Sequence, residues 1–179
     1  MGQGSLAVSA GFIHPKAHVE CAIIGEHVTI WQFATVIRGA FIGDGTKIGA
    51  GASIDAANVG ADCSIGASVF IPPGVSIGSR CFIGPGAIFC NDAWPRVSRE
   101  GYDFGRLLDG YSTVIRVNDD VSIGAGAIIL PGVTIGAGSI IAAGVTVEHP
   151  VPEGVILRRD GRLDPLRGWP VKRIIEAAC

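Results

Sequence analysis

A branched or aromatic residue returns every sixth position along most of this chain, and this period restricts the fold more than any other feature. A helix repeats about every 3.6 residues and a strand every 2, so six residues fit neither element alone. A short strand followed by a turn, three times per coil, does fit and predicts a parallel β-helix with a triangular interior. The leading positions run in three registers: Val19, Ile24, Ile30, Val36, Ile42, Ile48 and Ile54 after Ile13; Val59, Ile65, Ile71, Ile77, Ile83 and Phe89; and Val117, Ile123, Ile129, Ile135, Ile141 and Val147.

A second, smaller inward position supports this register. Four residues after each leading residue, in every full repeat, stands Ala, Val, Thr, Cys or Ser, as at Thr46 and Cys63. The two five-residue spacings, Val19 to Ile24 and Ile54 to Val59, fall at the same corner when the chain is counted in coils of three repeats. About twenty repeats then give six to seven coils, roughly 30 Å tall at about 4.8 Å per coil.

Two segments depart from the period. Residues 90–116 form a long excursion with aromatic and charged residues, and such an excursion from a solenoid is usually functional or interface-forming. The repeat ends near Pro150, so we divide the chain into a β-helix domain, 12–149, and a C-terminal part, 150–179. In the latter, Val155–Leu163 predicts a hairpin around Asp160-Gly161, and residues 170–178 predict a short helix.

Composition excludes several classes of protein. The net charge of −2 gives no electrostatic case for nucleic acid, and no basic cluster suggests a membrane surface. Mean hydropathy is high at +0.45, yet no apolar run approaches the roughly 20 residues of a spanning helix. No signal peptide is recognisable, and five cysteines without a CxxC spacing fit a reduced, cytoplasmic setting.

The histidines do not predict a metal site. A site between coils needs side chains about one coil apart, whereas three histidines lie in the first coil and one follows the last repeat. We therefore expect no metal. The histidines are His14, His18, His27 and His149.

The segment Ile88-Phe89-Cys90-Asn91-Asp92-Ala93-Trp94-Pro95-Arg96, together with Phe12-Ile13-His14-Pro15, Trp31-Gln32-Phe33 and Gly39-Ala40-Phe41-Ile42-Gly43, resembles the bacterial nucleotide-sugar N-acetyltransferases. The resemblance covers roughly residues 12–148, and its most specific element is the Asn-Asp-x-x-Pro-Arg segment. It implies a left-handed coil, a homotrimer, acetyl-CoA as donor, and a UDP- or dTDP-linked amino sugar as acceptor in cell-surface glycan (lipopolysaccharide) synthesis. Active sites are then expected between subunits, beside the excursion.

The same resemblance assigns residues to the acceptor site. Asn91 is the expected catalytic residue, aiming the amine by accepting a hydrogen bond from it, and His14 is the alternative base. Asn91 also suits a purely structural turn, and His14 can act only if a neighbouring subunit brings it close. Asp92 and Arg96 are expected to shape the sugar-nucleotide site, whereas Arg96 could also form an exposed ion pair.

Other residues are expected to contact the nucleotide of the acceptor and the coenzyme A of the donor. Trp31 and Arg38 could meet the nucleotide, although Trp31 also suits interface packing. Coenzyme A should follow the later coils, where Gly124, Ala125 and Ala143 leave the backbone unshielded. The family's usual Gly-Asn-Pro-Ala-Arg ending is missing, so either Arg158 or Arg159 contacts the 3′-phosphate or the donor is held differently.

Three further functions are compatible with the sequence. They are O-acetylation of a sugar, transfer of a different acyl chain, and a catalytically silent trimeric scaffold. The excursion argues against the scaffold, because a scaffold has little use for Asn-Asp and Pro-Arg at a coil corner.

Overall fold

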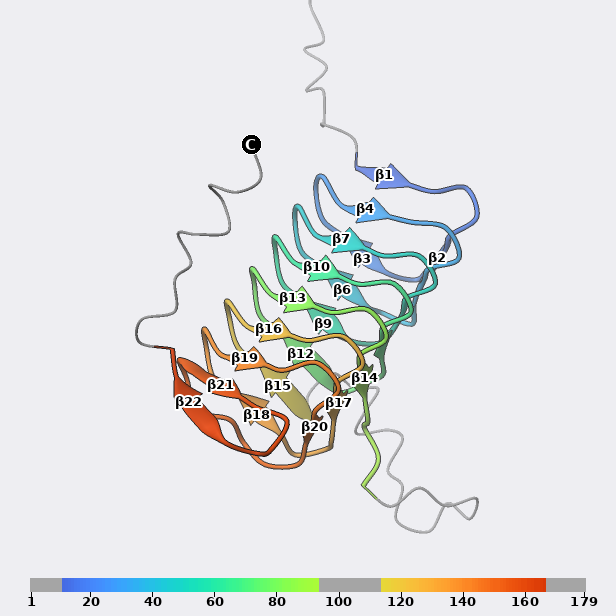
Figure 1. Ribbon diagram of the computed structural model, residues 1–179. Coiled ribbons are helices and arrows are strands. Elements are labelled where there is room, and N and C mark those ends of the chain that lie inside the picture. The colour runs from blue at the N-terminus through green and yellow to red at the C-terminus, as the bar shows by residue number, and fades with distance from the viewer. Residues whose placement is uncertain (1–10, 94–113, 167–179) are drawn as a thin grey trace, which may run out of the picture.

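The computed structural model describes residues 11–93 and 114–166 as one parallel β-solenoid of about seven coils, with no helix in these ranges. Figure 1 shows the coils stacked from β1 at one end to the β21–β22 hairpin at the other. Strands of the near face, such as β4 and β7, run from left to right, the chain turns behind at the right edge and returns behind, and successive coils advance downward, so the coil is left-handed (Figure 1). This confirms the expected hand, which is opposite to that of ordinary parallel crossovers. The predicted helix, residues 170–178, lies outside the described residues.

Three parallel sheets form the faces of the prism. The first face contains β1 Phe12–Ile13, β4 Thr29–Ile30, β7 Lys47–Ile48, β10 Ser64–Ile65, β13 Phe82–Ile83, β16 Ser122–Ile123, β19 Ile140–Ile141, β21 Val155–Leu157 and β22 Leu163–Pro165. The second contains β2 His18–Glu20, β5 Thr35–Ile37, β8 Ser53–Asp55, β11 Phe70–Ile71, β14 Ile88–Phe89, β17 Ile128–Ile129 and β20 Thr146–Val147. The third contains β3 Ile23–Ile24, β6 Phe41–Ile42, β9 Asn58–Val59, β12 Val75–Ile77, β15 Ile115–Val117 and β18 Thr134–Ile135.

The core confirms the predicted register. In most two-residue strands the first side chain points out and the second points in, and Ile42 and Ile123 have no exposed surface while Ile65 is 2% exposed. Each coil pairs with the next through a parallel register, for example Ile65 with Ile83. The apolar residue of each repeat therefore enters one continuous core shared by all coils.

Three corners join the faces, and we number them by the face that precedes each. The first corner lies between the first and second faces, the second between the second and third, and the third between the third and first. Because each strand pairs with a strand of the same face, residues of one corner stack in a column along the solenoid. The shortened corners at Cys21 and Ala56 both fall in the second-corner column, as their five-residue spacings predicted.

At the third corner, the small inward residue often carries a hydrogen-bonding atom. The Thr46 hydroxyl donates to the Gly60 carbonyl at 2.8 Å and accepts the Cys63 amide at 3.0 Å, so it links two coils. Ser139, directly before β19, donates to the Pro152 carbonyl and accepts the Val155 amide in the same way, and the Cys63 sulfur accepts the Cys81 amide. Thr, Ser and Cys at this position therefore satisfy buried backbone groups as well as fitting the space.

The excursion and the C-terminal part follow the prediction with one difference. Repeats resume at Ile115, earlier than the predicted loop end at 116, because Ile115 is fully buried and pairs with Val75. The predicted hairpin is present as β21 and β22, which pair antiparallel. No helix of the described ranges could cross a membrane.

Candidate functional site

Asn91 lies at the second corner of the fifth coil, directly after β14. Its side-chain nitrogen donates to the carbonyl oxygen of Pro73, one coil earlier, at 3.1 Å. The residue is half-buried, and Pro73 above it is buried. Because the amide nitrogen is held by a backbone carbonyl, the orientation of the side chain is fixed and its oxygen Oδ1 is the atom turned away from Pro73.

The excursion leaves and re-enters the solenoid at this same corner. The amide of Cys90 still bonds the Ile129 carbonyl in the next coil, so the ladder is intact up to the residue before Asn91. Where the chain returns, the Val114 amide donates to the Gly74 carbonyl, and the Gly132 amide donates to the Val114 carbonyl. The excursion therefore replaces only a corner, between Gly74 and Gly132.

Of the residues following Asn91, only the nearest are described. Asp92 is half-buried at the start of the excursion, where it can contribute to a polar site beside Asn91. Arg96 lies outside the described residues, so its predicted contact with a phosphate stays a prediction.

His14 does not meet Asn91 within one chain. It lies at the first corner of the first coil, where its Nδ1 accepts the Lys16 amide at 3.1 Å and its ring contacts Phe12 edge-on. Four coils separate it from Asn91, which is roughly 19 Å along the axis at the usual strand spacing. His14 can take part in catalysis beside Asn91 only through a second copy of the chain.

Trp31 and Arg38 have structural partners of their own. The Trp31 ring packs edge-on against Phe12 at 5.7 Å between ring centroids, and it is 47% exposed. Arg38 forms a two-pronged ion pair with Asp55 of the next coil at the second corner. Both side chains therefore contribute to contacts between early coils, whatever they do toward a ligand.

The small residues predicted for coenzyme A share the first corner of the sixth and seventh coils. A Cβ on Gly124 would lie 2.4 Å from the amide nitrogen of Ala143, so coil stacking requires glycine there. Ala125 and Ala143 are exposed. This column presents backbone to solvent, and its glycine has a packing reason that is independent of any ligand.

The two arginines predicted to contact the 3′-phosphate, Arg158 and Arg159, have different partners. Arg159 donates through Nε to the Ala143 carbonyl at 2.9 Å, which brings its guanidinium to the first-corner column. Arg158 instead pairs with Asp164 inside the hairpin at 2.9 Å. Of the two, Arg159 is the one beside the predicted donor surface.

The second face joins the Asn91 corner to the Ala143 corner. Its outward side chains in the fourth to sixth coils are Phe70, Ile88 and Ile128, which neighbour one another through the strand register. Phe70 and Ile88 are 44% and 42% exposed. We did not expect this apolar strip from the sequence, although the first residue of each two-residue strand, read as an outward column, would have found it.

Other groups do not assemble a site in the described residues. No three His, Cys, Asp or Glu side chains there lie close enough to hold a metal ion. Cys63 and Cys81 are buried at the small inward position of the third corner, and the Cys81 thiol lowers the pKa of Cys63 to about 7 by hydrogen bonding to it. The same pairing, with burial, raises the pKa of Cys81.

Comparison with known families agrees with the repeat. The bacterial transferase hexapeptide (six repeats) matches residues 56–91 and 115–149, and the hexapeptide repeat of succinyl-transferase matches residues 22–56. The two matches together span more than half of the chain.

Individual relatives are more distant. The bifunctional protein GlmU of Zymomonas mobilis is 33% identical over 124 residues, covering 67% of this chain and 26% of that protein. The UDP-N-acetylglucosamine acyltransferase of Arabidopsis is similar in fold, with a TM-score of 0.53 and 17% identity over 90% of this chain and 66% of that one. PerB from Caulobacter crescentus, solved with CoA and GDP-perosamine, has a TM-score of 0.48 and 24% identity over 85% of this chain and 56% of its own. The chain thus spans about a quarter of the GlmU protein and about half of PerB.

Proposed function

Because the chain belongs to the hexapeptide-repeat β-helix acyltransferases, we propose that it transfers the acetyl group of acetyl-CoA to the amino group of a UDP- or dTDP-linked amino sugar. The observation that carries this proposal is the anchored amide of Asn91 at the root of the excursion. In the same proposal the protein is a cytoplasmic homotrimer without a metal.

The chemistry asks for alignment more than for a strong base. The amine nitrogen attacks the thioester carbon, the C–N bond forms, the C–S bond breaks, and the departing thiolate accepts the proton lost by the amine. Holding the two reactants at about 3 Å in the right direction supplies most of the needed acceleration. With its Nδ2 bound to the Pro73 carbonyl, Asn91 offers Oδ1 as an acceptor for an amine N–H.

The donor is proposed to lie along the second face toward the first corner. Gly124, Ala125 and Ala143 provide an unshielded backbone there, and Arg159 adds a positive charge beside Ala143. The 3′-phosphate of coenzyme A is the group that this guanidinium suits, because a charge-assisted hydrogen bond is about twice as strong as a neutral one. Arg158 is a weaker candidate, since Asp164 neutralises it.

The acceptor is proposed to lie at the second corner, with Asp92 and Arg96 around its sugar and diphosphate. Trp31 and Arg38 lie in the second coil, three coils before Asn91, so they would reach this nucleotide only across a boundary between protomers. The apolar strip of the second face, Phe70, Ile88 and Ile128, supports burial of this face in an assembly.

The test is release of free thiol from acetyl-CoA with a panel of UDP- and dTDP-linked amino sugars. We expect turnover with one of them, and loss of activity by about 100-fold in Asn91→Ala, as for a reactant misplaced by an ångström. His14→Ala should keep more than about a tenth of the activity, since the departing thiolate is available as a proton acceptor. The opposite ranking would make His14 the base.

The alternatives give different results in the same assay. Turnover with hydroxyl sugars but not with amino sugars would replace the N-acetyltransferase with an O-acetyltransferase. Activity only with a longer acyl-CoA would identify that acyl-CoA, instead of acetyl-CoA, as the donor. Absence of turnover together with absence of coenzyme A binding would leave a scaffold.

A further inference from the structure

Two buried thiols lie on neighbouring coils at the third corner. Cys63 directly precedes β10 and Cys81 directly precedes β13, and these two strands pair in parallel with Ser64 opposite Phe82. The two cysteines therefore hold equivalent positions one coil apart, at roughly the 4.8 Å spacing of paired strands. Both side chains point into the prism, and each residue is only 2% exposed.

Hydrogen bonds hold the two sulfur atoms beside each other. The Cys81 amide donates to the Cys63 sulfur at 3.4 Å, and the Cys81 thiol hydrogen bonds to the Cys63 thiol. Each sulfur also lies 3.1 Å from a corner carbonyl, that of Gly78 for Cys63 and that of Asn118 for Cys81. The residues before and after the pair in this column are Thr46 and Val121, so each thiol has the other as its one sulfur neighbour along the described column.

The geometry suits a disulfide between the coils. Disulfides join residues whose Cα atoms lie about 4.4–6.8 Å apart, and this range includes the spacing of paired strands. The two thiols also differ in acidity. Hydrogen bonding from Cys81 lowers the pKa of Cys63 to about 7, whereas the same contact and burial raise the pKa of Cys81. An acidic thiol beside a less acidic one provides one sulfur that attacks an oxidant and a second that resolves the product.

We propose that Cys63 and Cys81 form a reversible disulfide when hydrogen peroxide oxidises the protein, and that this bond locks the fourth coil to the fifth. The Cys63 thiolate attacks a peroxide oxygen, so the S–O bond forms, the O–O bond breaks, and a sulfenic acid and a water molecule result. The Cys81 thiol then attacks the Cys63 sulfur, the S–S bond forms, and the sulfenic oxygen leaves as a second water molecule. The two thiols together lose two electrons and the peroxide gains them.

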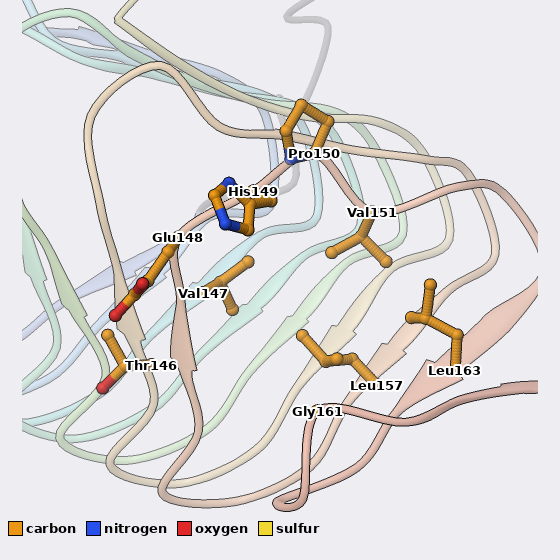
Figure 2. A pocket seen from close by; sticks show the side chains of 9 residues that line it. All are labelled: Thr146, Val147, Glu148, His149, Pro150, Val151, Leu157, Gly161 and Leu163. Carbon is orange, nitrogen blue, oxygen red and sulfur yellow. The ribbon is translucent and has the colours of Figure 1, made fainter.

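The peroxide has to reach the thiols through the third corner. A cavity of about 280 Å³ opens the prism at its C-terminal end, where Figure 2 shows Val147 and Leu157 around it. This cavity lies about two coils beyond Cys81, and its lining contains no cysteine. At the third corner, by contrast, the sulfurs lie directly behind the outer turns, 3.5 Å from the carbonyl oxygens of Ala61 and Ser79. Access therefore requires local opening of a corner turn and leaves the rest of the core closed.

The cross-link joins the two coils that also carry the candidate acceptor site. Pro73 belongs to the fourth coil and Asn91 to the fifth, and their hydrogen bond is the second-corner counterpart of the proposed link at the third corner. Closing the loop between residues 63 and 81 removes conformational freedom from the unfolded chain, so the oxidised protein should be more stable than the reduced one. The chemistry of the thiol pair is independent of the proposed acetyl transfer.

The experiment uses the unmodified chain and a full-length variant in which Cys21, Cys90 and Cys179 are replaced by serine, so that the thiol pair holds its only cysteines. Each folded protein is treated with hydrogen peroxide, then unfolded, alkylated with iodoacetamide and digested for mass spectrometry. We expect a peptide pair joined through Cys63 and Cys81, and recovery of both alkylated thiols after treatment with dithiothreitol. Tm should rise by roughly 5–10 °C on oxidation and return on reduction, as for a closed loop of about this length.

Cys81→Ser is the matched control, because Ser139 in the same column shows that serine is accommodated there with its hydrogen bonds made. This variant should form no cross-link and show no rise in Tm, and dimedone should trap the sulfenic acid left on Cys63. The proposal is overturned if both thiols stay free in the folded protein under peroxide, or if the cross-link forms only in urea. Pairing of Cys63 with a different cysteine in the unmodified chain, or a disulfide that leaves Tm unchanged or lower, would also overturn it.

Discussion

Replacing Thr46 by valine tests whether the third-corner side chains hold the coils together by hydrogen bonding. The side chain has no exposed surface, and it serves the Cys63 amide as acceptor and the Gly60 carbonyl as donor. Valine has nearly the same volume, so the substitution removes both bonds without opening a cavity. Each buried group left unpaired costs about 1–3 kcal/mol, less for the Gly60 carbonyl because that bond is only partly buried.

We expect Thr46→Val to lower the free energy of unfolding by about 2–3 kcal/mol. For a chain of this size the loss corresponds to a fall of roughly 4–12 °C in Tm, measured by circular dichroism or calorimetry. Thr46→Ser is the matched control, because it keeps the hydroxyl and removes one methyl group, which costs about 0.8 kcal/mol.

Val121 provides the reverse experiment, because it occupies the same column and offers no acceptor to the amide of the next coil. Val121→Thr should stabilise the protein by about 0.5–1 kcal/mol. The reasoning is refuted if Thr46→Val is no worse than Thr46→Ser, or if Thr46→Val and Val121→Thr change Tm in the same direction.

Three further outcomes follow from the described geometry. Arg159→Ala should raise KM for acetyl-CoA about tenfold or more, whereas Arg158→Ala should not; steady-state kinetics in which the two are equal would remove Arg159 from the donor site. Gly124→Ala should cost about 3 kcal/mol or more because its Cβ meets the next coil, and Gly126→Ala only about 1–2 kcal/mol for its positive φ, as urea denaturation can compare. The Arg80 guanidinium, which donates a hydrogen bond to Asp120, lowers the pKa of that carboxyl group. The charged carboxylate therefore stabilises the fold above its unfolded pKa, and this stabilisation is lost as pH falls through the folded pKa. Asp120→Asn should reduce the fall of Tm at acid pH in a Tm-versus-pH series.

The inward residues could be predicted almost completely, because a six-residue period leaves no other way to bury them. Ile42 and Ile123 are buried where the period placed them, and the hairpin after Val155 was recognisable from Asp160-Gly161. The end of the excursion was misjudged by two residues, since Ile115 precedes the first Val-led repeat and looks like loop sequence until its partner Val75 is known.

The site was less accessible to prediction, because it depends on stacking between coils. The sequence indicates Asn91 as a candidate but cannot show that Pro73, eighteen positions earlier, holds its amide. Likewise, the partnership of Arg38 with Asp55 and the separation of Arg159 from Arg158 depend on which residues fall one coil apart on the surface.

The single-corner attachment of the excursion has a consequence for how such enzymes can diversify. Both of its ends are fixed by ladder hydrogen bonds on adjacent coils, at Cys90 and at Val114, so the strands before and after it keep their partners whatever lies between. Doubling the length of a loop closed in this way costs only about 0.6 kcal/mol in closure entropy. Selection can therefore lengthen, shorten or rewrite this segment, and with it the acceptor site of the proposed function, while the solenoid that carries it stays unaltered.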